Sequence, residues 1–113
     1  MLMKCRKFDI RQWVLVTDWN PLTIWLYKEP YIRFAAADFS FTKIHNKYSH
    51  LSNNSISKNA AKQKPTHTIE GNMWDLETFQ DYLRSEFGYD VWMDLLSSKI
   101  KQIVINSLKC VQD

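Results

Sequence analysis

The stretch that decides the fold is residues 7–19, KFDIRQWVLVTDW. Its first half alternates charged and apolar side chains, as Asp9 and Ile10 illustrate, and it becomes continuously apolar from Trp13 to Val16. A period of two followed by an apolar run is typical of a strand that passes from a half-exposed to a buried position. We therefore predict a β-strand over residues 7–19.

Turn residues follow this strand and introduce two more. The run DWNP, residues 18–21, predicts a turn because Asp and Asn side chains bond to the nearby backbone and proline fixes φ. Strand-forming residues then occupy 23–27 and 31–35, and the run KEP, residues 28–30, separates them. We expect three antiparallel strands that form a meander.

A long connection follows, over residues 37–71, and it has no sustained hydrophobic period. We expect one short strand near residues 51–56. Residues 41–69 contain five lysines and three histidines but no carboxylate. Such a field favours an acidic ligand, although an ordinary solvated loop explains the charge equally well.

Two amphipathic helices are expected in the last third of the chain. Asp75 can cap the first helix and Gly88 can end it. The second starts near Val91, and its apolar residues recur at the spacing of a buried face. Tyr82, Trp92 and that apolar stripe are expected in the core. The predicted fold class is α+β, an antiparallel β meander followed by two amphipathic helices.

Length and composition exclude several classes of protein. At 113 residues the chain can hold one domain at most. With Gly71 and Gly88 as its two glycines, it can contain neither a GxGxxG turn nor a GxxxxGK[ST] loop. No apolar run approaches the roughly 18–20 residues that span a bilayer. The cysteines and histidines lack the spacing of a zinc site, a disulfide framework or a catalytic triad.

Charged residues gather on one face of the first strand. Lys7, Asp9 and Arg11 share that face because side chains alternate along a strand. Arg33, on a neighbouring predicted strand, extends the row if the register permits. The row suits a polyanion such as a nucleoside triphosphate, but ordinary cross-strand ion pairs explain it as well. Similarly, HLSNNS, residues 50–55, could hold phosphates or a metal-bound water, or could merely satisfy a turn.

Three strings of residues together resemble the tubulin-tyrosine-ligase-like family in their order and spacing. They are RKFDIR at residues 6–11, LYKE at 26–29 with Arg33 after it, and HLSNNSISK at 50–58. The sequence QWVLVTDWNPLTIW at residues 12–25 looks most like that of the glycylase branch, which starts glycine side chains on tubulin. The resemblance extends over nearly the whole chain.

The resemblance implies that residues 1–113 are an internal part of an ATP-grasp domain, with 37–71 as its long basic connection. Its cofactors are ATP and Mg²⁺. The metal ligands are expected outside this chain, because the family's phosphate-covering loop and its Glu-x-Asn motif are not in it. The isolated chain is therefore expected to be inactive. Carried over by position, the site residues are Arg11 and Arg33 for the phosphates or the substrate carboxylate, Lys7 for ATP, Asp9 for the ribose, and Ser52 and Asn53 near the triphosphate.

The expected function is thus that of a fragment of a ligase that adds glycine to glutamate side chains of tubulin tails. Its expected partners are the acidic C-terminal tails of tubulin, microtubules and glycine, without nucleic acid or membrane. The expected location is the cytoplasm, the cytoskeleton and the axoneme of a cilium or flagellum. Two alternatives stay open: a tubulin glutamate or tyrosine ligase, and a noncatalytic module that binds acidic tubulin tails.

Overall fold

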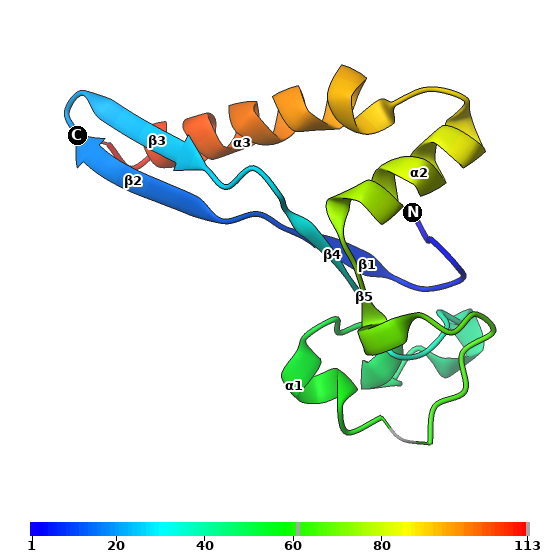
Figure 1. The fold of residues 1–113 in the computed structure, drawn as a ribbon. Helices are drawn as coiled ribbons and strands as arrows, with labels where there is room; N and C mark the ends of the chain where they lie inside the picture. The colour runs from blue at the N-terminus through cyan, green and yellow to red at the C-terminus, as the bar shows by residue number, and fades with distance from the viewer. Residues whose placement is uncertain (61, 113) are drawn as a thin grey trace. The chain divides into compact units, whose positions relative to one another are not determined.

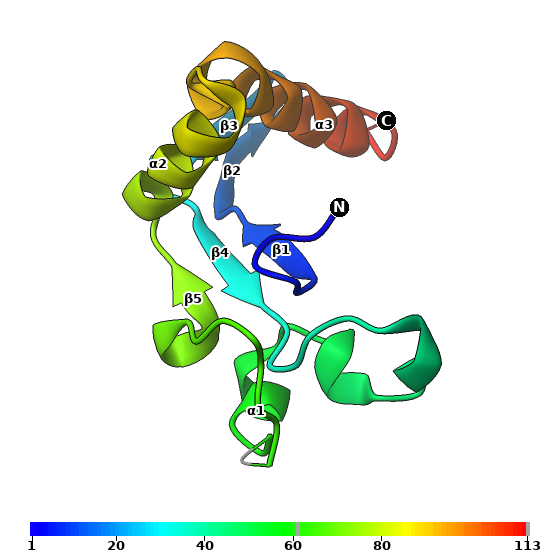
Figure 2. The same cartoon turned by 90° about the vertical axis from the view of Figure 1, so that its right-hand side faces the viewer.

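The computed structural model describes residues 1–60 and 62–112. The chain forms two compact units, whose elements are drawn in Figure 1 and Figure 2. Unit 1 comprises Met1–Arg11 and Tyr31–Asp75, and unit 2 comprises Gln12–Pro30 and Leu76–Asp113. Antiparallel strands and helical segments occur in both, which confirms the α+β class. Among the described residues, no helix is long and apolar enough to cross a membrane.

Unit 1 is built on a three-stranded antiparallel sheet with the order β1-β4-β5. Its strands are β1 (Phe8–Arg11), β4 (Tyr31–Phe34) and β5 (Met73–Trp74). Phe8 pairs with Phe34, and Ile32 pairs with both Ile10 and Trp74, so these five side chains share the apolar face. Ile32 and Phe34 are fully buried, and the rings of Phe34 and Trp74 meet edge to face at 4.9 Å. The opposite face of β1 and β4 is left to charged residues.

The strand pairing differs from the predicted meander. The expected strand over residues 7–19 is divided into β1 and β2 (Val14–Trp19), and β2 pairs with β3 (Leu22–Leu26) in a separate two-stranded sheet. β1 instead pairs with β4, so the β2–β3 hairpin is nested in chain order between two strands of the other sheet. The turn predicted at residues 18–21 is confirmed, because the hairpin reverses between Trp19 and Leu22.

The division of the strand has a local cause at Gln12. When the pairing of β1 with β4 and the pairing of β2 with β3 are both extended toward Gln12, this one residue lies opposite the three residues 28–30. The segment 28–30 therefore contains two extra residues, which interrupt the ladder. Pro30 also lacks an N–H group that could donate to a ladder. The side-chain amide of Gln12 donates to the carbonyls of Trp13 at 3.0 Å and Tyr27 at 2.8 Å. These bonds satisfy backbone acceptors where regular pairing is absent.

The connection over residues 37–71, apart from Ala61, which lies outside the described residues, contains short helical turns. These are 3₁₀ turns at Phe41–Lys43, Lys47–Ser49 and Glu70–Asn72 and the helix α1 (Asn54–Ser57). The strand predicted near residues 51–56 is therefore wrong. Asn53 begins α1, and its carbonyl accepts from the N–H groups of Ile56 and Ser57. Asn and Ser favour helix starts over strand interiors, which explains the difference.

Arg6 ties this connection to the sheet of unit 1. Its side chain is fully buried, and its guanidinium lies 5.7 Å from the centre of the Phe34 ring. It donates to the carbonyls of Ala35 at 3.2 Å and His67 at 2.7 Å, and to the side-chain oxygen of Asn72 at 2.7 Å. Bonds to segments 29 to 66 residues away make Arg6 the main polar anchor of the unit.

In unit 2, α3 (Ser97–Lys109) lies beside the β2–β3 hairpin, as Figure 1 shows. Side chains of β3 and α3 line a common groove of about 510 Å³, and the Gln112 amide donates to the Trp19 carbonyl at 2.6 Å. The helix α2 (Leu76–Phe87) begins directly after Asp75, and Gly88 ends it at a φ of +79°. Both predicted helices are therefore confirmed.

The second predicted helix begins with a π-helical turn, Trp92–Leu96, which continues into α3. Phe79, Leu83, Val91 and Trp92 form the buried core of the α2 side, with the Phe79 and Trp92 rings 6.2 Å apart. The expectation that the whole apolar stripe is buried is wrong: no described residue of α3 is buried, and Ile103 is 63% exposed. The α3 residues Val104 and Ile105 are half-buried and line the groove that α3 shares with β3.

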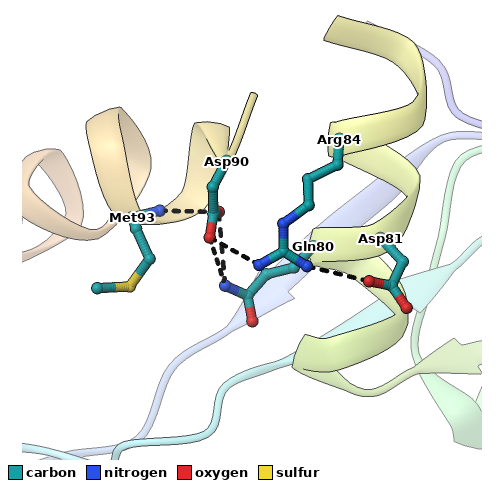
Figure 3. Close-up of polar contacts among 5 residues, drawn as sticks. All are labelled: Gln80, Asp81, Arg84, Asp90 and Met93. Carbon is teal, nitrogen blue, oxygen red and sulfur yellow. Dashed lines mark hydrogen bonds and ion pairs between the residues drawn. The ribbon is translucent and has the colours of Figure 1, made fainter. Parts of the chain in front are cut away.

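A polar cluster joins α2 to the segment after it (Figure 3). Arg84 pairs with Asp81 at 3.0 Å and with Asp90 at 2.9 Å, and Gln80 also donates to Asp90. Asp90 accepts in addition from the backbone N–H of Met93 at 3.2 Å. Desolvation acts to raise the pKa of Asp90, but the bonds from Met93, Arg84 and Gln80 outweigh it and lower the pKa.

Candidate functional site: the charged face of the first sheet

The face of unit 1 opposite its apolar core carries the charged residues that the sequence places on one side. Asp9 is the register partner of Arg33 on β4, so both side chains lie on the same face. Arg11 follows on that face by alternation, and its charge acts on Asp9. Lys7 precedes β1, and the ladder continues through its carbonyl, which accepts from the N–H of Ala35 at 2.9 Å. The structure thus brings together the four predicted charges.

Asp9 and Arg33 form a bidentate ion pair. Nε of Arg33 lies 2.9 Å from Oδ1 of Asp9, and Nη2 of Arg33 lies 2.9 Å from Oδ2. Ser52, from the long connection, donates its hydroxyl to the same carboxylate. Desolvation acts to raise the pKa of Asp9, but the bonds from Arg33 and Ser52 and the charges of Arg33 and Arg11 lower it overall. Asp9 is therefore held in its ionised form.

Lys7 is held by two groups from the connection. Its Nζ atom lies 2.7 Å from Nδ1 of His50 and 4.8 Å from the centre of the Phe39 ring. The other ring nitrogen of His50 lies 2.6 Å from the carbonyl oxygen of Ile44. Sequence reasoning did not place His50 in the site. Its position two residues before Ser52, in the string HLSNNS that could hold phosphates, is the signal that could have found it.

A cavity of about 580 Å³ opens beside these contacts, within the size range of small-molecule sites. Lys7, Asp9, His50 and Ser52 contribute polar groups to it, and its apolar wall is formed by Met1, Leu2, Phe8, Phe39 and Phe41. An ammonium and a hydroxyl beside an aromatic wall suit a ligand that has an anionic end and an apolar or ring-shaped end.

The remaining predicted residues are placed differently. Arg11 and Arg33 adjoin Asp9 on the strand face and are not among the residues that line the cavity. Asn53 is exposed at the start of α1, with its backbone carbonyl engaged by the helix. The structure therefore places Lys7, Asp9 and Ser52 in one cavity, the two arginines beside it, and Asn53 next to Ser52 in the chain.

The donor groups of this face fit the phosphates of a nucleotide better than they fit a metal ion. Ammonium, guanidinium and hydroxyl groups donate to phosphate oxygens. Mg²⁺ prefers several oxygen ligands in near-octahedral geometry, and Asp9 is the one carboxylate among the described residues that line the cavity. Within residues 1–60 and 62–112, no group of three or more His, Cys, Asp or Glu side chains is placed to hold a metal ion.

The chain belongs to the tubulin-tyrosine ligase family, whose model matches residues 1–113. Tubulin glycylase 3C of Tetrahymena thermophila is 46% identical over 114 residues, which cover 100% of this chain and 11% of the relative. Protein monoglycylase TTLL8 of Mus musculus is 43% identical over 119 residues, which cover 100% of this chain and 14% of the relative. Tubulin monoglycylase TTLL3 of Homo sapiens is 41% identical over 109 residues, which cover 95% of this chain and 14% of the relative.

These similarities confirm the resemblance drawn from the sequence, including its closeness to the glycylase branch. The chain spans between 11% and 14% of the length of these three relatives. The region that matches this chain is therefore a small part of each of these relatives.

Proposed function

We propose that this chain forms part of the ATP and substrate site of a ligase that adds glycine to glutamate side chains in tubulin tails. The observation that carries the proposal is the charged face, where Asp9 is bonded to Arg33 and Ser52 and lies beside Lys7 and Arg11. Its support is that this face occurs in a member of the tubulin-tyrosine ligase family similar to proteins named glycylases.

The proposed roles are those that the family resemblance implies for these positions. The Lys7 ammonium, at the wall of the cavity, binds a phosphate of ATP, and Asp9 accepts from the ribose. The Ser52 hydroxyl and the neighbouring Asn53 lie near the triphosphate. Arg11 and Arg33 neutralise the phosphates or the substrate carboxylate, where a fixed cation offsets the charge that develops during phosphoryl transfer.

When bound, ATP supplies the phosphoryl group that converts the glutamate carboxylate into an acyl donor for the amine of glycine. The residues of this chain bind and orient the reacting groups, because ammonium and guanidinium groups need not move protons to stabilise phosphate oxygens. We further propose that the fold is part of an ATP-grasp domain and that the Mg²⁺ ligands lie in other segments of the protein.

The proposed substrates are the acidic C-terminal tails of tubulin, alone or in microtubules. The corresponding location is the cytoplasm and cytoskeleton, including the axoneme of a cilium or flagellum. Ligases of the same chemistry that use glutamate or tyrosine instead of glycine are the first alternative. The lysine-rich connection supports a second alternative, a noncatalytic module that binds acidic tails, because residues 41–69 carry no carboxylate.

One experiment separates these candidates. The full-length product of the gene that carries this segment is incubated with tubulin, Mg²⁺, ATP and one labelled amino acid: glycine, glutamate or tyrosine. We expect ATP-dependent incorporation of glycine alone. Incorporation of glutamate or tyrosine instead would replace the proposed substrate. Salt-sensitive binding of a glutamate-rich tail peptide without any incorporation would favour the noncatalytic module.

A further inference from the structure

His50 lies between a backbone carbonyl and a lysine ammonium. Its Nε2 atom is 2.6 Å from the oxygen of Ile44, and its Nδ1 atom is 2.7 Å from Nζ of Lys7. A carbonyl oxygen can only accept a hydrogen bond and an ammonium can only donate one. Nε2 must therefore carry the proton while Nδ1 presents its lone pair to Lys7. In this arrangement the imidazole is neutral and in a single tautomer.

A second contact restrains the same ammonium. The Phe39 ring lies 4.8 Å from Nζ of Lys7, and the ring of His50 meets that of Phe39 nearly at right angles with 5.9 Å between centres. The attraction of a cation for a ring face adds to the hydrogen bond from the ammonium to His50. Together, His50 and Phe39 hold the end of a long, flexible side chain at the wall of the cavity.

We propose that His50 is a positioning residue that holds the Lys7 ammonium in place to meet a phosphate of the bound nucleotide. The inference rests on the proposed function, since that function makes Lys7 an ATP contact. A side chain that is already placed loses less conformational freedom when the ligand binds. His50 thus raises the affinity for the nucleotide through Lys7, and its own substitution has no effect once Lys7 is removed.

The affinity for Mg-ATP is measured in the full-length gene product for the wild type and four variants, namely His50→Ala, His50→Asn, Lys7→Met and His50→Ala combined with Lys7→Met. His45→Ala, at an exposed position on the same connection, is the matched control. We expect His50→Ala to weaken binding about tenfold, as loss of a bond to a charged group implies, and to change little in the Lys7→Met background.

His50→Asn keeps an acceptor near the position of Nδ1, so it should retain most of the affinity. His45→Ala should match the wild type. Wild-type affinity in His50→Ala would overturn the proposal. An equal loss for His50→Ala with and without Lys7→Met would do the same, because His50 would then act independently of Lys7.

A second measurement distinguishes failure of this inference from failure of the proposed function. Imidazole ¹⁵N–¹H correlation spectra of the full-length gene product, recorded without any nucleotide, report the tautomer. We expect the neutral Nε2–H form for His50 and a clear shift of its Nδ1 resonance in Lys7→Met. If neither the wild type nor any variant binds ATP, the proposed function is wrong. The spectra alone then decide whether His50 positions Lys7. An Nδ1–H form of His50, or an Nδ1 resonance unaffected by Lys7→Met, would rule out the positioning role of His50.

Discussion

Asp9 and Arg33 face each other across β1 and β4 and are joined by two hydrogen bonds of 2.9 Å each. The side chain of Arg33 is 18% exposed and that of Asp9 is 40% exposed, so the pair lies at the boundary between the sheet and solvent. Because each partner fixes the orientation of the other, the pair sets where the cations of this face can meet a ligand.

The same pair makes stability depend on pH. The pKa of Asp9 is lower in the folded chain than its ordinary value, so its stabilisation is present above the ordinary pKa of about 4 and is lost as the pH falls through the folded value. Asp9→Asn should lower the free energy of unfolding by about 0.5–1 kcal/mol at pH 7, the range for partly exposed ion pairs, and by much less at pH 2.5. Urea unfolding at both pH values measures this difference, with Glu29→Gln as the exposed control. An equal loss at the two pH values would contradict the assignment.

Removal of the buried guanidinium of Arg6 should be far more damaging. Arg6→Met leaves the carbonyls of Ala35 and His67 and the side-chain oxygen of Asn72 without their donor, so we expect a loss of about 3 kcal/mol or more. Arg6→Lys should recover only a part, because one ammonium cannot reproduce a fork of donors. Urea unfolding of these variants, with the exposed Lys62→Met as control, tests this. A loss below about 1 kcal/mol for Arg6→Met would show that the anchor is dispensable.

Gly88 tests the end of α2 through backbone conformation alone. Its φ is +79°, and a Cβ atom built on it meets nothing within 4 Å, so Gly88→Ala introduces strain without a clash. We expect Ala to lower the free energy of unfolding by about 1 kcal/mol and Asn, which tolerates this conformation better, to lower it by less. Thermal unfolding of the two variants gives the comparison. Equal losses would indicate that Gly88 matters for another reason.

Asp90 should protect the start of the second helical segment from local opening. Its carboxylate accepts from the N–H of Met93, as Figure 3 shows, so Asp90→Ala should speed hydrogen exchange of the Met93 amide. Asp94→Ala, at an exposed position in the same turn, should leave that amide unchanged. Exchange measured by NMR at neutral pH, where Asp90 is ionised, decides between them, and an unaltered Met93 rate in Asp90→Ala would exclude the capping role.

The sequence predicted the elements of this fold better than their pairing. Side-chain alternation correctly placed Asp9 and Arg33 on strands, and helical spacing located α2 and α3. The nested hairpin was missed because the separation of β1 from β2 depends on how residues 28–30 align with Gln12, and a break between two strands does not by itself reveal which strands pair.

The residues of the site were likewise predicted only in part. Lys7, Asp9 and Arg33 could be grouped because their spacing and the family resemblance agree. His50 was missed, since it lies in the irregular connection and is 43 positions from Lys7 in the sequence. The buried role of Arg6 escaped for a similar reason, because strand alternation carries no information about a side chain that bonds to a distant loop.

The central claim is that the cations of this face serve ATP-dependent ligation of glycine. Its most direct test is the rate at which the full-length gene product incorporates labelled glycine into tubulin, compared between the wild type, Arg33→Ala and the control Arg84→Ala, which removes an ion-paired arginine of α2. We predict that Arg33→Ala lowers the rate on the order of 100-fold, as loss of a charge-stabilising donor does, while Arg84→Ala stays near the wild type and the isolated 113 residues are inactive. An unchanged rate in folded Arg33→Ala, or no glycine incorporation by the wild type, would contradict the account.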